Sequence, residues 1–89
     1  MTIGSLRPGV APERVLPTAA AAASELTIVE ASSVNVVAGS ARVTVRFTAD
    51  SVNQALEVGG HVVTATAVVA EPVTWVVTER IKGRWYPRR

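Results

Sequence analysis

Hydrophobic and polar residues alternate along positions 42–48, where Val43, Val45 and Phe47 are separated by arginines and threonines. A period of two places these three side chains on one face of a strand and the polar side chains on the other. Gly39 lies just before this segment, and glycine readily adopts the backbone conformation of a tight turn. The pattern therefore predicts a half-buried strand that pairs with the segment preceding Gly39.

Four further segments favour strand because they are rich in valine and in other residues that suit a pleated surface. They cover residues 25–31, 34–37, 61–69 and 73–81. Residues 50–60 are ambiguous, since Asp50 can cap a short helix that ends at Gly59, whereas Leu56 and Val58 can begin a strand. We favour a short helix or an ordered loop there.

About five strands joined by short turns indicate an all-β fold, a small antiparallel β-sandwich or barrel, for residues 25–83. The composition agrees with this prediction, because the 89 residues include 17 valines and 14 alanines but only four aromatic residues. A single domain of this size has a thin core. No cysteine is present, so disulfides cannot reinforce it.

Residues 1–24 differ from the rest of the chain and predict an extended N-terminal arm rich in proline and alanine. Pro8, Pro12 and Pro17 disfavour a regular helix or a central strand as far as position 17. Residues 19–23 are all alanine and can form one or two helical turns capped by Thr18. At the other end, Gly83 is expected to end the last strand and to leave residues 84–89 as a basic, aromatic tail.

Charge is mild overall, with a formal net charge of +2, but five of the nine basic residues lie in the last ten positions. Arginine interleaved with Trp85 and Tyr86 can anchor a protein interface, remain solvated, or grip nucleic acid by stacking and phosphate contacts. A net charge this small disfavours strong phosphate binding, so we do not expect a nucleic-acid partner. The longest apolar run, residues 62–70, is too short to cross a bilayer, and we expect no membrane partner.

The residues that usually carry catalysis are sparse. His61 is the only histidine and Asp50 the only aspartate, and the glutamates are scattered along the chain. These residues do not form a nucleophilic triad, an acid–base pair or an oxygen-ligand loop in sequence. We therefore expect no enzyme activity, no catalytic residues, no cofactor and no metal site, and an enzyme centred on His61 is the weakest alternative.

Two valine-rich segments and a longer one near the C-terminus resemble a known family. The first two are Val43-Thr-Val-Arg-Phe47 and Val62-Val-Thr-Ala-Thr66, and the third is Thr74-Trp-Val-Val-Thr-Glu-Arg-Ile81-Lys-Gly83. Together they resemble small β domains in minor tail and other virion proteins of phages of high-GC Gram-positive bacteria. The resemblance covers residues 41–83 and departs after Gly83, where related domains continue into another strand. It implies a structural role in a phage particle.

These observations lead us to expect a non-enzymatic structural protein of a bacteriophage virion, as a tail-associated or capsid-accessory subunit made in the host cytoplasm. Its partners would be other virion proteins and copies of itself, held by its terminal segments. The alternative is a small nucleic-acid-binding module that uses the C-terminal arginine and aromatic cluster. The expected interface residues are Leu6, Val10, Val15 and Leu16 in the arm and Arg84, Trp85 and Tyr86 in the tail.

Overall fold

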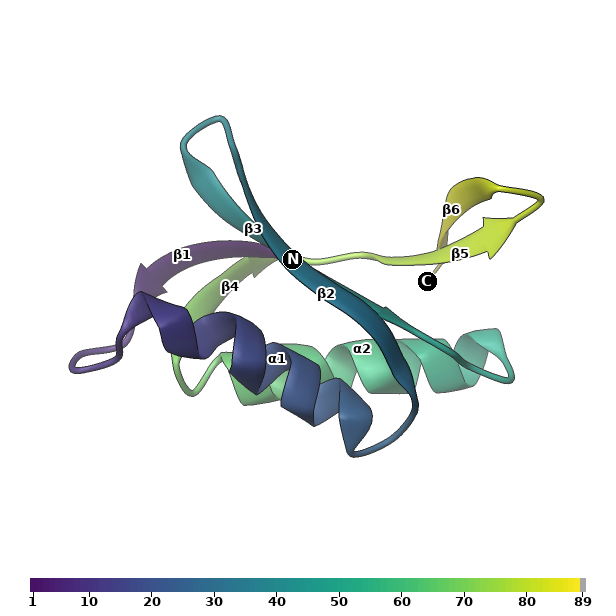
Figure 1. The fold of residues 1–89 in the computed structure, drawn as a ribbon, viewed down its shortest axis with the longest axis horizontal. Helices are drawn as coiled ribbons and strands as arrows, with labels where there is room; N and C mark the ends of the chain where they lie inside the picture. The colour runs from purple at the N-terminus through teal and green to yellow at the C-terminus, as the bar shows by residue number, and fades with distance from the viewer. Residues whose placement is uncertain (89) are drawn as a thin grey trace.

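The computed structural model describes residues 1–88, which form a four-stranded sheet covered on one side by two helices, with a separate two-stranded hairpin (Figure 1). In chain order the elements are β1 (Thr2–Leu6), a 3-10 turn (Pro12–Arg14), α1 (Val15–Ser24), β2 (Val29–Val37), β3 (Ser40–Phe47), α2 (Val52–Thr66), β4 (Ala70–Thr74), β5 (Val77–Ile81) and β6 (Arg84–Arg88).

The main sheet has the strand order β2-β3-β1-β4, and every neighbouring pair is antiparallel. Combined with the succession β-α-β-β-α-β, this is the split β-α-β arrangement known as ferredoxin-like. Strands cover 42% of the chain, so the prediction of a mainly antiparallel β protein is confirmed in that broad sense. The prediction of a sandwich or barrel is wrong, because helices form the second layer and the sheet is not closed.

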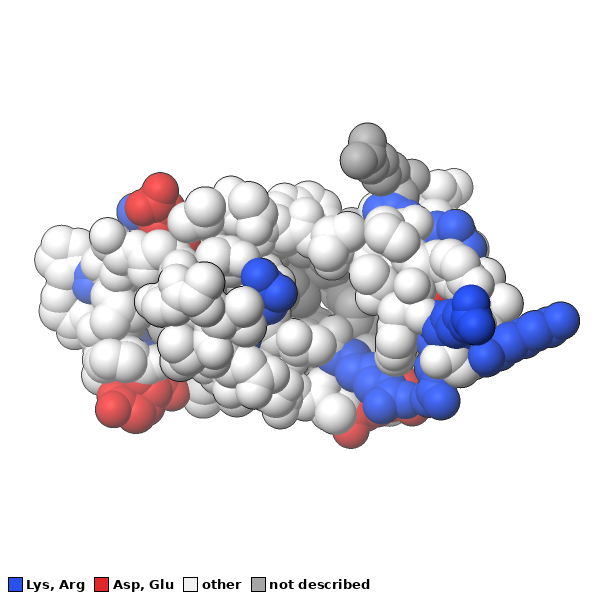
Figure 2. Space-filling model, turned by 90° about the horizontal axis from the view of Figure 1, so that it is seen from above, with Lys and Arg blue, Asp and Glu red and all other residues white. Residues whose placement is uncertain are grey.

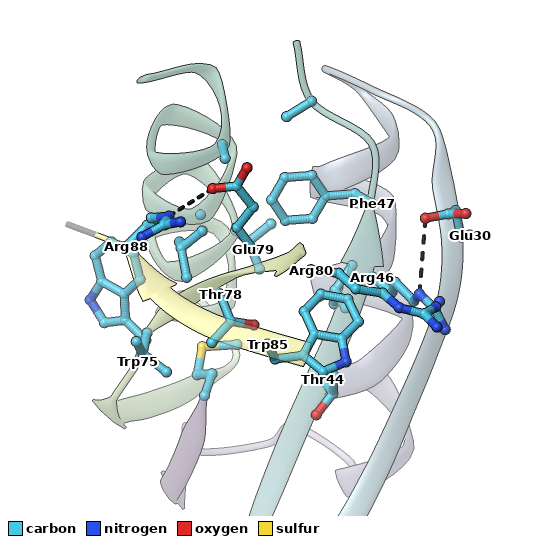
Figure 3. Close-up of a pocket in the computed structure, with 18 of the residues that line it drawn as sticks. Glu30, Thr44, Arg46, Phe47, Trp75, Thr78, Glu79, Arg80, Trp85 and Arg88 are labelled. Carbon is cyan, nitrogen blue, oxygen red and sulfur yellow. Dashed lines mark hydrogen bonds and ion pairs between the residues drawn. The ribbon is translucent and has the colours of Figure 1, made fainter. Parts of the chain in front are cut away.

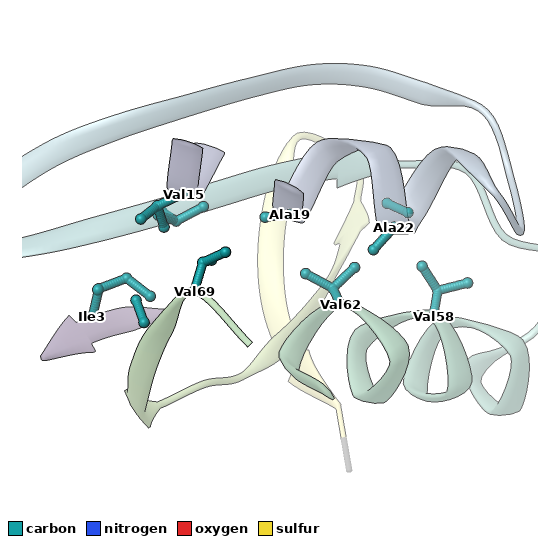
Figure 4. Close-up of a cluster of buried hydrophobic side chains, with 10 residues drawn as sticks. Ile3, Val15, Ala19, Ala22, Val58, Val62 and Val69 are labelled. Carbon is teal, nitrogen blue, oxygen red and sulfur yellow. The ribbon is translucent and has the colours of Figure 1, made fainter. Parts of the chain in front are cut away.

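The core lies between the sheet and the two helices (Figure 4). Ala19, Ala22 and Ala23 of α1 are almost completely buried, and Val58 and Val62 of α2 lie opposite them. Alanine allows close approach of the two helices because its side chain is a single methyl group. The alanine run is therefore the helix-packing surface of the fold rather than part of a free arm.

The N-terminal arm predicted for residues 1–24 is contradicted by the structure. β1 is a central strand, and α1 begins at Val15 despite the proline at position 17. Pro17 lies in the first turn of α1, where a backbone N–H has no partner within the helix, so the missing donor costs little. Thr18 is not a cap; its hydroxyl donates to the carbonyl of Arg14 at 2.7 Å.

α2 replaces the predicted strand at residues 61–69. Its start is fixed by Ser51, whose hydroxyl accepts from the N–H of Gln54 at 3.1 Å, while the Gln54 side chain accepts from the N–H of Asp50 at 2.6 Å. Such reciprocal contacts satisfy donors that a helix leaves unpaired. Val58, Val62 and Thr66 recur every four residues and form the buried face.

Both hairpins close with two-residue turns that end in glycine. Ala38 and Gly39 join β2 to β3, and Lys82 and Gly83 join β5 to β6; all four residues have positive φ angles, between 51° and 81°. This is the type I′ geometry, whose twist suits antiparallel strands. The turn at Gly39 confirms the predicted pairing of residues 42–48. Gly83 does not release a tail, since residues 84–88 return along β5.

Candidate functional site

A groove of about 950 Å³ lies between the end of β3, α2 from Val52 to Val63, and the β5–β6 hairpin (Figure 3). Its apolar walls are formed by Val45, Phe47, Val62, Trp75 and Val77. Seen from above, the surface is hollowed beside the hairpin (Figure 2). This concave surface is our candidate functional site.

One wall of the groove is the edge of β3. Met1 pairs with Val43 by two backbone hydrogen bonds, the Met1 amino group donating at 2.9 Å and the Val43 N–H donating to Met1 at 2.8 Å. In β1, Thr2 lies opposite Arg42 and Ile3 lies opposite Ala41 of β3, whereas β3 pairs with β2 as far as Phe47. Within residues 1–88, the stretch from Thr44 to Phe47 is therefore paired with β2 alone.

The opposite wall is the hairpin, which is seated on α2 by a close contact. A Cβ built on Gly59 would lie 2.6 Å from Cγ2 of Val77 and 3.1 Å from the Trp75 ring. Glycine at position 59 thus allows β5 to approach the helix. Val77 is buried by this contact, while Trp75 stays about half exposed.

The outer surface beside the groove combines arginine with aromatic rings. The Arg46 guanidinium lies 5.5 Å from the centre of the Trp85 ring, and it also forms a long ion pair of 4.0 Å with Glu30. On the opposite face of the hairpin, which carries Val77, Arg88 donates to Glu79 at 2.7 Å and lies 6.0 Å from the Tyr86 ring. Lys and Arg gather over this end of the molecule (Figure 2).

A second exposed apolar surface is the tip of the β2–β3 hairpin, which projects beyond the helices (Figure 1). Val34, Val36 and Val37 are all exposed there, Val36 by 75%. The outer edge of β2 has no neighbouring strand among the described residues, and from Ala31 to Val37 it carries no charged side chain. A long, uncharged edge of this kind favours pairing with another chain.

Three of the four N-terminal interface residues predicted from the sequence belong to the protein's own core region. Val15 is buried in the core, and Val10 and Leu16 pack against it. Leu6, at the end of β1, is 36% exposed. The prediction that these four side chains form a free contact surface is wrong for Val15, because the proline-rich segment folds back onto its own sheet.

The C-terminal residues Arg84, Trp85 and Tyr86 lie together on β6, and all are exposed. They are therefore available to a partner, and their role as an interface stays a prediction. Arg89 lies outside the described residues. Arg46 and Phe47, the other wall of the site, did not enter the predicted interface, because only the tertiary fold brings positions 46 and 85 together.

His61 and Asp50 do not form a catalytic pair. Asp50 precedes α2 and His61 lies well along it, so about 15 Å of helix separates them at 1.5 Å per residue. The nearest acid to His61 is Glu25, with Nε2 and Oε2 3.6 Å apart across the two helices. The described residues contain no cluster of three His, Cys, Asp or Glu that could hold a metal ion.

Within residues 1–88, no helix is long and apolar enough to cross a membrane. No family model matches the chain, and neither a curated protein nor a solved structure matches it. The fold alone does not assign a function, since this arrangement serves unrelated activities.

Proposed function

We propose that the chain is a non-enzymatic structural subunit of a bacteriophage particle, which holds neighbouring subunits through its two hairpins. The observation that supports this most directly is the exposed aromatic pair on β6, Trp85 and Tyr86, with Trp85 half exposed beside Arg46. Tryptophan, tyrosine and arginine dominate the binding energy of protein interfaces. The terminal arms expected from the sequence are replaced in this proposal by the hairpins.

The phage assignment draws on the resemblance to virion domains. Its segments fall on β3, on α2 and along β4 and β5, up to the turn at Gly83. All three segments therefore contribute residues to the groove. A thin core that leaves large apolar side chains exposed on both hairpins also suits a protein whose surface is completed by neighbours.

Association of the purified chain tests the interface. We expect concentration-dependent oligomers in sedimentation velocity experiments, and we expect Trp85→Ala to weaken association by roughly 2–4 kcal/mol, about a 30- to 700-fold change in Kd. Val68→Ala is a matched control, because Val68 is also exposed but lies away from the groove. A wild-type chain that stays monomeric, alone and with purified particles, would contradict the proposal.

The phage assignment needs a separate test. Particles purified from a strain that encodes the chain should contain it in a fixed ratio to the other virion proteins, measured by quantitative mass spectrometry. Absence of the chain from such particles would reject the virion role even if the interface is real.

A nucleic-acid-binding module is the second candidate, and one arrangement favours it. Val43, Val45 and Phe47 face the helices, so Arg42 and Arg46 lie on the open face of the sheet, where Arg46 meets Trp85. Arginine beside an aromatic ring can contact phosphate while a base stacks on the ring. Retention on single-stranded DNA that falls steeply with salt, and that Arg42→Gln with Arg46→Gln reduces, would favour this candidate over assembly.

A further inference from the structure

The edge of β3 inside the groove presents backbone groups that are ready to pair. The N–H and C=O of Val43 both point toward Met1. Backbone groups of a strand alternate in direction, so those of Val45 and Phe47 point the same way, into the groove. The N–H of Thr48 donates instead to Ile28, which confirms this alternation at the other end of β3.

The space in front of this edge continues the line of β1. Met1 lines the groove beside Val43, and β5 continues the direction of β4 on the far side, after a break at Trp75 and Val76 (Figure 1). Ala55, Gly59 and Val62 of α2 lie along the groove as a floor. Among residues 1–88, no strand occupies the groove between β3 and the hairpin, so it can accept one extended segment.

The two sides of this position differ in chemistry. Toward α2 it meets the apolar side chains of Phe47, Val62 and Val77, together with the Arg88–Glu79 ion pair on the same face of the hairpin as Val77. Toward the open face it meets arginine: Arg42 and Arg46 lie on that face of β3. Arg80 pairs with Trp85 across the hairpin, and Trp85 lies beside Arg46, so Arg80 shares the same face. An occupant with alternating side chains would place apolar residues inward and acidic residues outward.

We propose that the groove receives one extended segment of a neighbouring subunit, in which apolar residues alternate with Asp or Glu, and that this segment pairs antiparallel with Thr44–Phe47 of β3. Strand addition of this kind takes its affinity from backbone hydrogen bonds and its specificity from alternate side chains. This inference rests on the proposed assembly role and specifies how one contact of the assembly is made.

Amide hydrogen exchange by NMR tests the pairing. In the free chain at low concentration, the amides of Val45 and Phe47 should exchange fast, while those of Thr44 and Arg46 are protected by β2. The probe is a short peptide in which valine alternates with glutamate. At saturation it should slow exchange at Val45 and Phe47 by at least about tenfold, and continued protection of Thr44 and Arg46 shows that the chain is folded.

Two matched controls separate pairing from simple charge attraction. The same peptide with N-methyl groups on alternate amides keeps its side chains but loses the donors along one edge, so it should give no protection. A peptide with lysine in place of glutamate should fail on the native chain and should protect a variant that carries Arg42→Glu, Arg46→Glu and Arg80→Glu, in which the charge on this face is reversed.

Three results would overturn the inference. Slow exchange at Val45 and Phe47 in the free, dilute chain would mean that the edge is already paired. Protection that rises with the concentration of the chain alone would make the occupant a second copy. Equal protection by the N-methylated peptide would remove backbone pairing as the mechanism. The exchange readouts require no association between copies of the chain, so failure of the wider assembly role is detected separately.

Discussion

Gly59 of α2 and Val77 of β5 are so close that a methyl group on Gly59 would lie 2.6 Å from the Val77 side chain. Gly60, the next residue, has no atom within 4 Å of such a methyl group. The pair provides a matched test of how the hairpin is held. Gly60→Ala should stabilise the chain by about 0.5–1 kcal/mol through helix propensity alone.

Gly59→Ala should lose this gain, because the stiff valine and the Trp75 ring must move away from the helix. We expect it to be less stable than Gly60→Ala by at least about 1 kcal/mol and to change the tryptophan fluorescence of the folded state. Urea unfolding followed by fluorescence measures both. Equal stabilities of the two variants would show that the hairpin does not rest on Gly59.

Val62 and Val68 distinguish the helix from the strand predicted for this segment. In a strand over residues 61–69 the two side chains share a face, whereas in the structure Val62 is 7% exposed and Val68 is 74% exposed. Val62→Ala should destabilise the chain by about 2 kcal/mol, from the lost methyl groups and the cavity. Val68→Ala should stay within about 0.5 kcal/mol. Similar losses in thermal unfolding would argue against the helix.

The projecting tip of β2 is expected to drive association of the isolated chain. Val36→Lys adds a charge beside the free edge, so it should reduce aggregation while changing the free energy of unfolding by no more than about 0.5 kcal/mol. Val68→Lys, with the same added charge at a similarly exposed site, is the control. Light scattering against concentration measures the effect. If both variants aggregate like the wild type, the edge of β2 is not the cause.

The amino group of Met1 should make stability depend on pH. Desolvation by burial, followed by the nearby Arg42 charge, lowers its pKa below the ordinary value of 8.0. Between the folded pKa and 8.0 the unfolded chain binds more protons, so the free energy of unfolding should rise with pH across that window. Unfolding measured between about pH 6 and 9 should show the rise, and an N-acetylated chain should lack it. The same slope in both chains would assign the effect to another group.

β3 was predicted correctly because its alternation fits only one kind of secondary structure. Val43, Val45 and Phe47 share one face of a strand but would not share one face of a helix. Residues 61–69 carry two patterns at once. Their alternation suits a strand, whereas Val58, Val62 and Thr66 have helical spacing. The N-cap at Ser51 and the packing of this face against α1 stabilise the helix instead. Local propensity for strand was overridden by tertiary contacts.

The groove could not be predicted from the sequence in the same way. Its walls come from β3, α2 and β5, and nothing in the sequence around Val45 or Val77 indicates that these segments meet. The aromatic pair at Trp85 and Tyr86 was found from composition alone, but its partner Arg46 depends on the turn at Lys82 and Gly83. The residue types identified side chains that commonly form interfaces, and the topology of the fold determines which of them share a surface.

The position of β1 in the sheet also determines the order in which the strands can pair during folding. β1 is the first element of the chain, yet it lies between β3 and β4, and Thr2 is paired with Thr74. The β2–β3 hairpin involves neighbours in sequence and can form early, whereas the β1–β4 contact must close a loop of most of the chain. During synthesis, the central strand can gain its second neighbour only after β4 has left the ribosome. Until then, one side of β1 is exposed to any other nascent copy, so the rate of synthesis should influence the yield of correctly folded chain.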